Sequence, residues 1–201
     1  MSRLEVALVP PVKLVLDAKG GHLLGSNGRY EKLLPDLRGI YRDAEAFDRL
    51  LAVDDGTPVY WVEHSRTEGG PGGLITGISV LEPGRVGDEY FMTRGHLHAT
   101  EDRSEFYFCV AGRGVMLLET RTGESQATEF RAGEAVYVPG HWIHRSVNVG
   151  GERLVMMFCY ASDAGQDYEI IERAGGMRQL VIESGGRWTT RPNSNHRGYD
   201  A

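Results

Sequence analysis

Short runs of apolar and β-branched residues follow one another through the middle of the chain, and glycine-rich turns separate them. Gly112-Arg-Gly114, Arg121-Thr-Gly123 and Gly150-Gly151 are three such turns. Many short strands at this spacing are typical of a β-sandwich or barrel. The pattern predicts strands at 58–64, 74–81, 89–93, 106–111, 114–120, 126–130, 135–139, 145–149 and 153–160.

Helical patterns are few. Asp43 can cap a helix over 44–52, in which Phe47, Leu50 and Leu51 form one apolar face. A second short helix is predicted over 168–174, ended by two glycines. We therefore expect an N-terminal extension over 1–55 whose one short helix packs on a barrel, the barrel itself over 56–185, and a polar C-terminal tail over 186–201.

Composition agrees with one globular domain and narrows the class of protein. A chain of 201 residues is long enough for one domain with extensions. The net charge of −6 argues against a nucleic-acid surface. No apolar run approaches the roughly 20 residues that a membrane span needs. The first residues lack the pattern of an export signal, and Cys109 and Cys159 lie in apolar runs as buried free thiols would. A cytoplasmic protein without nucleic-acid or membrane partners is expected.

Histidines and a carboxylate fall at a spacing that can build one metal site. His96 and His98 are two residues apart, so on a strand both side chains point to the same face. Glu105 opens the next predicted strand, and a hairpin would return it beside them, while His144 could close the site from a later strand. Imidazole and carboxylate together suit Fe, Mn, Ni, Co or Zn. The rival ligands are Glu101, Asp102 and His141, which stand in predicted loops or turns.

These residues form two motifs. The first is Gly95-His-x-His-x(6)-Glu105, and the second is Gly133-x(5)-Pro139-x(4)-His144. They resemble the two motifs of the cupin superfamily, whose fold is a double-stranded β-helix, or jelly roll. Seven stretches, at 83–87, 91–99, 102–107, 114–118, 136–139, 142–148 and 161–168, extend the resemblance to the cupin-type glucose-6-phosphate isomerases over roughly residues 40–185.

The resemblance implies a ligand set and a substrate site. His96, His98, Glu105 and His144 match the ligands of one divalent metal per subunit, usually Fe²⁺, with Mn, Ni, Co or Zn as alternatives. Arg94 stands where a Lys is common, and Gln166 where a His can be found. The positions that match substrate contacts are Ser79, Thr93, Gly95, Tyr107 and Tyr168, with a weaker match at Tyr60.

Some of these residues also have simpler explanations. Thr93 is an ordinary strand residue, Gly95 can serve a turn, and Tyr107 can be a core aromatic.

The activity implied by the resemblance is interconversion of glucose 6-phosphate and fructose 6-phosphate, in glycolysis and gluconeogenesis, by an all-β enzyme. It would run through a metal-stabilised cis-enediolate with Glu105 as the base, and a hydride shift is the rival mechanism. Mannose 6-phosphate is an additional candidate substrate. A cupin dioxygenase and a non-catalytic metal-dependent sugar-binding cupin are the alternative functions. By analogy with the family, we expect a homodimer.

Overall fold

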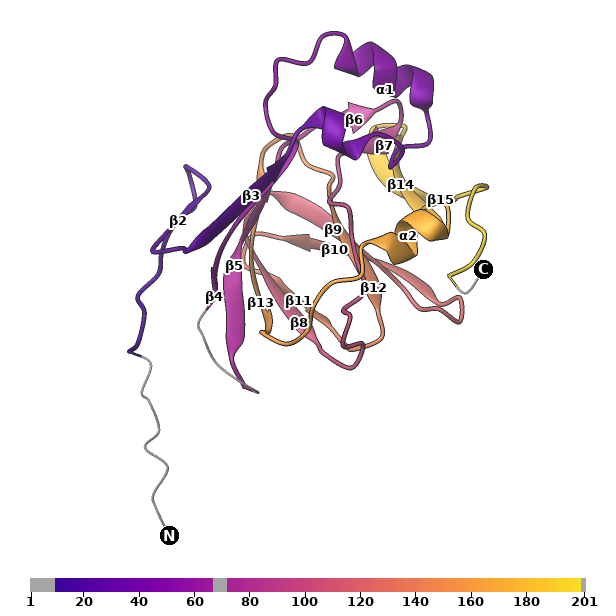
Figure 1. Ribbon diagram of the computed structural model, residues 1–201. Coiled ribbons are helices and arrows are strands. Elements are labelled where there is room, and N and C mark those ends of the chain that lie inside the picture. Colours follow the sequence, from indigo (N-terminus) through magenta and orange to yellow (C-terminus); the bar gives the residue numbers. More distant parts are fainter. Residues whose placement is uncertain (1–9, 67–71, 200–201) are drawn as a thin grey trace.

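The computed structural model describes residues 10–66 and 72–199 (Figure 1). Within them the chain is mostly strand, with two short α-helices, α1 (Ala44–Leu51) and α2 (Glu169–Arg173), and a 3₁₀ turn η1 (Leu34–Leu37). The strands are β1 (Val15–Asp17), β2 (His22–Leu24), β3 (Gly28–Lys32), β4 (Tyr60–Arg66), β5 (Leu74–Leu81), β6 (Arg85–Val86), β7 (Glu89–Tyr90), β8 (Glu105–Ala111), β9 (Arg113–Glu119), β10 (Ser125–Arg131), β11 (Ala135–Val138), β12 (Ile143–Asn148), β13 (Leu154–Ala161), β14 (Gln179–Ser184) and β15 (Arg187–Pro192).

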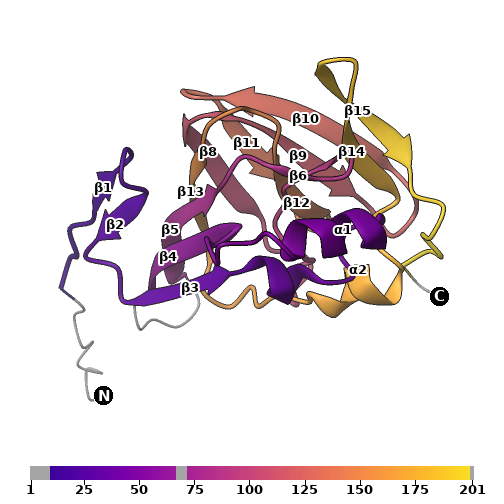
Figure 2. The same cartoon turned by 90° about the horizontal axis from the view of Figure 1, so that it is seen from above.

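Two antiparallel sheets enclose the main core, as Figures 1 and 2 show from two directions. The larger sheet has the order β11-β8-β13-β5-β4-β3, and the smaller has the order β10-β9-β12. A third sheet, β15-β14-β7-β6, and the β1–β2 hairpin lie at the periphery. This arrangement confirms the predicted all-β cupin jelly roll, although hydrogen bonds do not close the two main sheets into a continuous barrel among the described residues.

The predicted strands are present, with small shifts at their ends. The strand expected at 89–93 is the exception: it becomes the two-residue β7, followed by an isolated bridge between Met92 and Val147. The chain then leaves the third sheet and runs beside β12. The helix predicted over 44–52 is α1, where Asp43 Oδ1 accepts a hydrogen bond from the amide of Ala46 at 2.8 Å. The side chain of Phe47 in α1 is buried.

Both ends of the chain carry strands that the sequence pattern does not predict. The N-terminal extension contains β1 to β3, and β3 pairs with β4 along its whole length. The C-terminal residues, for which the sequence predicts a polar tail, contain β15. This strand pairs with β14 along its whole length, from Arg187 opposite Ser184 to Pro192 opposite Gln179. Beyond β15, the Asn193 amide donates to the carbonyls of Gly175 and Met177. Polar side chains hold this segment in place. The alternation of apolar residues along the sequence carries no information about such polar contacts.

The core between the two main sheets is apolar and close-packed. All six residues of β12 and six of the seven in β9 are buried. The large sheet covers one face of these strands, and the segment from α2 to β15 covers part of the other face. There the carboxylate of Glu119 accepts hydrogen bonds from the backbone amides of Arg178 and Gln179. Each fully buried Leu, Ile or Met side chain contributes about 1.5–3 kcal/mol relative to an exposed one. A continuous core of this kind gives the site residues rigid positions.

Both cysteines are free thiols, as expected; Cys109 is buried, whereas Cys159 is only partly buried.

In the part of the chain that the structure describes, no helix is long and apolar enough to cross a membrane.

Candidate metal centre and its cavity

Four buried side chains from three parts of the chain meet at one point. His96 and His98 lie in the segment between β7 and β8, Glu105 opens β8, and His144 lies in β12. One ligand atom from each residue lies within 4.8 Å of the others. Oε2 of Glu105 lies 3.6 Å from Nε2 of His96, 3.2 Å from Nε2 of His98 and 3.1 Å from Nε2 of His144. The structure therefore brings together the four residues that the sequence motifs select.

Backbone pairing places these side chains. His96 and His144 form an antiparallel bridge in which each amide donates to the other's carbonyl at 3.0 Å. Gly95 makes this approach possible, because its φ is +73° and an added Cβ would lie 2.8 Å from the carbonyl oxygen of His144. Glu105 is held between β11 and β13, opposite Val138 and Tyr160. Residues far apart in sequence thus become neighbours through sheet register.

Hydrogen bonds assign the protons on two of the imidazoles. Nδ1 of His98 lies 2.8 Å from the carbonyl oxygen of Arg103, and Nδ1 of His144 lies 3.0 Å from that of Trp142. A carbonyl oxygen only accepts, so Nδ1 carries a proton and donates, and in the neutral ring the lone pair then resides on Nε2. This is the orientation that metal-ligating histidines adopt.

The third imidazole, that of His96, differs at its Nε2 atom. Nε2 of His96 is buried without a hydrogen-bond partner. Burial, with His144 nearby, lowers the pKa of His96 to about 4, so this ring is neutral at pH 7. Burial alone would raise the pKa of Glu105, but its imidazole partners hold that pKa well below the usual range. Three lone pairs and one carboxylate therefore converge in a buried space, and a divalent cation fits this donor set.

The rival ligands lie outside the cluster. His141 is exposed in a left-handed turn with φ of 68°, and its Nδ1 lies 3.5 Å from the carboxylate of Glu101. Glu101 in turn pairs with Arg121, and Asp102 pairs with Arg103. Ion pairs at the protein surface account for all three residues.

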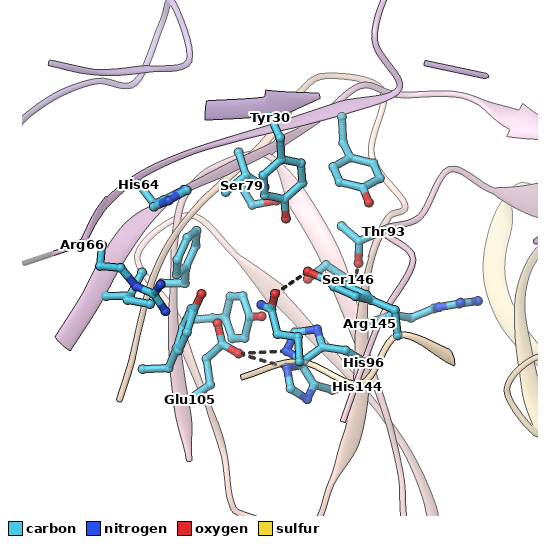
Figure 3. A pocket seen from close by; sticks show the side chains of 18 residues that line it. Tyr30, His64, Arg66, Ser79, Thr93, His96, Glu105, His144, Arg145 and Ser146 are labelled. Carbon is cyan, nitrogen blue, oxygen red and sulfur yellow. Dashed lines mark hydrogen bonds and ion pairs between the residues drawn. The ribbon is translucent and has the colours of Figure 1, made fainter. Parts of the chain in front are cut away.

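A cavity of about 240 Å³ opens beside three of the four ligands, His96, Glu105 and His144 (Figure 3). Four of the five predicted substrate contacts line it, namely Ser79, Thr93, Tyr107 and Tyr168, and so does Tyr60. The fifth, Gly95, is not among the lining residues, and its conformation and close packing give it a backbone role.

Hydroxyl groups gather at the end of the cavity away from Glu105. Thr93 Oγ1 accepts the amide of Ser146 at 3.1 Å, so its proton remains to be donated elsewhere. Ser79 Oγ is buried without a hydrogen-bond partner. Figure 3 shows both side chains at this end, with Tyr30 near Ser79. These donors can bind an oxygen-rich or anionic group that enters the cavity.

Tyr168 forms a wall of the cavity and connects it to the two positions where the chain departs from the family pattern. Its hydroxyl donates to Gln166 Oε1, and its ring centroid lies 5.6 Å from that of His96. The guanidinium of Arg94 lies over the same ring at 5.3 Å. Arg94 therefore acts on the cavity through this tyrosine, whereas Gln166 lines the cavity itself and also accepts the tyrosine's hydroxyl.

The sequence analysis missed several lining residues on the large sheet. These are Tyr30 on β3, Val62, His64 and Arg66 on β4, Ile75 on β5, and Phe158 and Tyr160 on β13; Arg145 and Ser146 on β12 were missed as well. A signal was available, because Tyr60, Val62, His64 and Arg66 alternate along one strand and therefore share a face. Gly77, opposite Phe158, leaves room for that ring, since an added Cβ would lie 2.5 Å from it.

The matching family model and the similar proteins carry the same description. The family model described as "Glucose-6-phosphate isomerase (GPI)" matches residues 31–197. A glucose-6-phosphate isomerase of Sinorhizobium medicae (strain WSM419) is 45% identical over 96% of this chain and 91% of its own. A relative of the same name from Thermococcus gammatolerans (strain DSM 15229 / JCM 11827 / EJ3) is 41% identical over 88% of this chain and 91% of its own. Another, from Thermococcus litoralis, is 37% identical over 93% of this chain and 97% of its own.

A solved oxalate oxidase structure aligns with 56% of this chain and 56% of its own, at 16% identity and a TM-score of 0.46. The family match rests instead on the family model and on relatives that align along nearly their whole length. This chain belongs to the cupin-type glucose-6-phosphate isomerase family.

Proposed function

We propose that this protein interconverts glucose 6-phosphate and fructose 6-phosphate, with a divalent metal held by His96, His98, Glu105 and His144. One observation carries the proposal: a buried four-ligand cluster stands beside a cavity whose other end presents hydroxyl donors. The cluster suits the two oxygens at C1 and C2 of an open-chain sugar. The hydroxyls of Thr93 and Ser79 suit its phosphate.

The reaction moves a carbonyl between C1 and C2. A bound divalent cation would supply positive charge where negative charge develops on these two oxygens. Buried aromatic side chains around the cavity, among them Tyr107 and Phe158, exclude water and so strengthen that electrostatic interaction. Thr93 and Ser79 orient the substrate from its phosphate end. The protein thus holds the reacting carbons next to Glu105.

Glu105 is the proposed base that transfers the proton between the two carbons. Its carboxylate is the only acidic side chain among the described lining residues of the cavity. Its lowered pKa keeps it ionised at pH 7, and the same interactions make it a weak base. A cation held by the four ligands would offset this weakness by making the carbon-bound proton of the substrate more acidic. Direct hydride transfer from C2 to C1 is the alternative, and it requires no base.

Isotope incorporation separates these two routes. Product formed in deuterated water at early turnover is expected to carry deuterium at the carbon that receives the proton. Product without deuterium would favour the hydride shift and remove Glu105 as the base.

The identity of the metal, the compartment, the oligomeric state and a second substrate are inferred from the family resemblance. Iron is the metal that we propose, in a cytoplasmic homodimer, and mannose 6-phosphate is a second candidate substrate. A cupin dioxygenase is the alternative function for a site with three imidazoles and one carboxylate. It predicts oxygen consumption and requires no group that binds phosphate.

Reloading metal-free protein with single metals tests substrate, metal and oxygen dependence together. With fructose 6-phosphate under anaerobic conditions, we expect glucose 6-phosphate to form only in metal-loaded samples, most rapidly with Fe²⁺. His144→Ala, treated in the same way, is the matched control and should stay inactive. Turnover that requires oxygen, or metal-loaded protein without isomerase activity, would contradict the proposed function.

A further inference from the structure

A second and larger hollow, of about 790 Å³, adjoins the cavity of the metal centre. The two share Tyr168 and Arg145 as lining residues. Four arginines line the second hollow, and we call it the arginine crevice: Arg38 after η1, Arg94 before the metal ligands, Arg145 on β12 and Arg197 after β15. Its volume falls within the roughly 300–1,000 Å³ typical of small-molecule sites.

The crevice is locally cationic although the chain carries a net charge of −6. Two carboxylates, Asp36 and Glu172, also line it. Asp36 is already engaged, because its Oδ2 accepts the amide of Leu33 at 3.0 Å. Arg38 pairs with Asp48 through one terminal nitrogen, at 2.8 Å. Four guanidinium groups therefore outnumber the acidic groups at this surface.

Two of the arginines have no ion-pair partner in the structure. Over residues 10–66 and 72–199, no carboxylate lies within 4.0 Å of the guanidinium of Arg94 or Arg145. Arg94 instead lies over the ring of Tyr168. Arg145 donates to the carbonyl of Arg94 at 2.5 Å and contacts Met92 Sδ at 2.9 Å.

Arg145 points to a missing partner. The residue is only 5% exposed, and its Nε is buried without a hydrogen-bond partner. In Figure 3 its guanidinium extends away from His96 and His144, so it is not directed at the metal centre. Glu89 and Glu119 lie deeper in the core and compensate part of its charge. A buried donor that bonds to nothing is destabilising, and a hydrogen-bond acceptor beside Nε would relieve this.

We propose that the arginine crevice binds a small phosphate-bearing anion, at a site separate from the metal centre. Guanidinium groups bind phosphate oxygens through paired, charge-assisted hydrogen bonds, which distinguishes phosphate from neutral ligands. The site goes beyond the proposed isomerisation, since it requires neither the metal nor turnover.

The crevice is physically connected to the metal centre through one side chain. Arg94 lies over Tyr168 at 5.3 Å, and the ring of Tyr168 lies 5.6 Å from that of His96.

Calorimetric titration of the metal-loaded protein with inorganic phosphate, at fixed ionic strength, tests the site. The double variant Arg38→Gln/Arg197→Gln removes two crevice charges, and Arg49→Gln/Arg187→Gln removes two charges from exposed positions outside the crevice. We expect one binding phase to weaken at least tenfold in the crevice variant and to persist in the control variant and in Thr93→Val. If the double variant does not fold, Arg197→Gln alone carries the test.

Phosphate binding that is the same in wild type and crevice variant would overturn the proposal, as would an equal loss in the control variant. The measurement reads binding and not turnover. If the protein has no isomerase activity but still shows the phosphate-binding phase that depends on Arg38 and Arg197, the proposed isomerase is contradicted and the crevice site is supported. If the protein is an active isomerase but lacks this binding phase, the isomerase is supported and the crevice site is contradicted.

Discussion

Nε2 of His144 lies 3.1 Å from Oε2 of Glu105, while Nδ1 of the same ring donates to a backbone carbonyl. In the neutral ring, the proton on Nδ1 leaves the lone pair of His144 on Nε2, facing the carboxylate. A positive charge at this point, carried by a bound cation or by a proton, would offset the repulsion between the two electron-rich atoms. The carbonyl of Trp142 thus orients the His144 ring so that Nε2 can serve as a ligand of the proposed metal.

Removing His144 should remove the metal. His144→Ala deletes one of four ligands, and we expect metal affinity to fall by more than the roughly 10–100-fold typical of losing an outer partner. Metal analysis after dialysis measures this. His141→Ala is the matched control, since His141 is exposed and pairs with Glu101, and it should retain metal fully. Loss of metal from His141→Ala with retention in His144→Ala would reverse the assignment.

Thr93 should act on the sugar phosphate and not on the metal. Thr93→Val keeps the shape of the side chain but removes the hydroxyl, and a lost hydrogen bond to a charged group costs about 1.5–3 kcal/mol. We expect KM for fructose 6-phosphate to rise roughly 10–100-fold, at 1.4 kcal/mol per factor of ten. Steady-state kinetics with parallel metal analysis measures both effects. Thr93→Ser, which retains a hydroxyl, should remain within a few-fold of wild type, and an unchanged KM in Thr93→Val would exclude the contact.

Gly95 should be required for the fold of the site. Gly95→Ala forces a left-handed φ on alanine, and its Cβ would stand 2.8 Å from Arg145 Cβ and from the carbonyl oxygen of His144. We expect a loss of more than about 1 kcal/mol in the free energy of unfolding, together with weaker metal binding.

Gly56 provides the matched control, because its φ is +79° and an added Cβ would meet nothing within 4 Å. Gly56→Ala therefore reports the backbone strain alone. Chemical denaturation of both variants gives the comparison. Equal destabilisation of the two would show that the contacts with β12 contribute nothing.

Glu129 should give the protein stability that disappears in acid. Hydrogen bonds from Arg113, with help from Trp188 and Arg131, lower the pKa of Glu129 to about 2. A carboxylate with a lowered pKa stabilises the fold fully above its unfolded pKa of about 4.3, and this contribution is lost as the pH falls through about 2.

Glu129→Gln should therefore be less stable than wild type by about 1 kcal/mol at pH 7, as is typical of partly exposed ion pairs, and the difference should shrink between about pH 4.3 and pH 2. Urea denaturation at pH 7 and pH 3 measures it. Glu45→Gln, which breaks an exposed pair at 3.7 Å, should show little effect at either pH. A pH-independent difference for Glu129→Gln would mean that packing, and not charge, explains the loss.

The sequence by itself determined the strands of the two main sheets except β3, together with α1 and the four candidate ligands. Each depends on local rules: alternation decides which face a strand residue occupies, and Asp43 caps the helix that follows it. His96 and His98 could be paired from their spacing alone. Glu105 and His144 could be added because the residues around them match a family pattern.

Tertiary structure decided which residues share the cavity and which groups lack a partner. Tyr30, Arg66 and Tyr160 line the same space only because β3, β4 and β13 belong to one sheet in a particular order. The unpartnered Nε of Arg145 likewise exists only once β12 is buried on both faces. Spacing along the chain cannot encode these facts, because long-range register and desolvation arise when distant segments pack together.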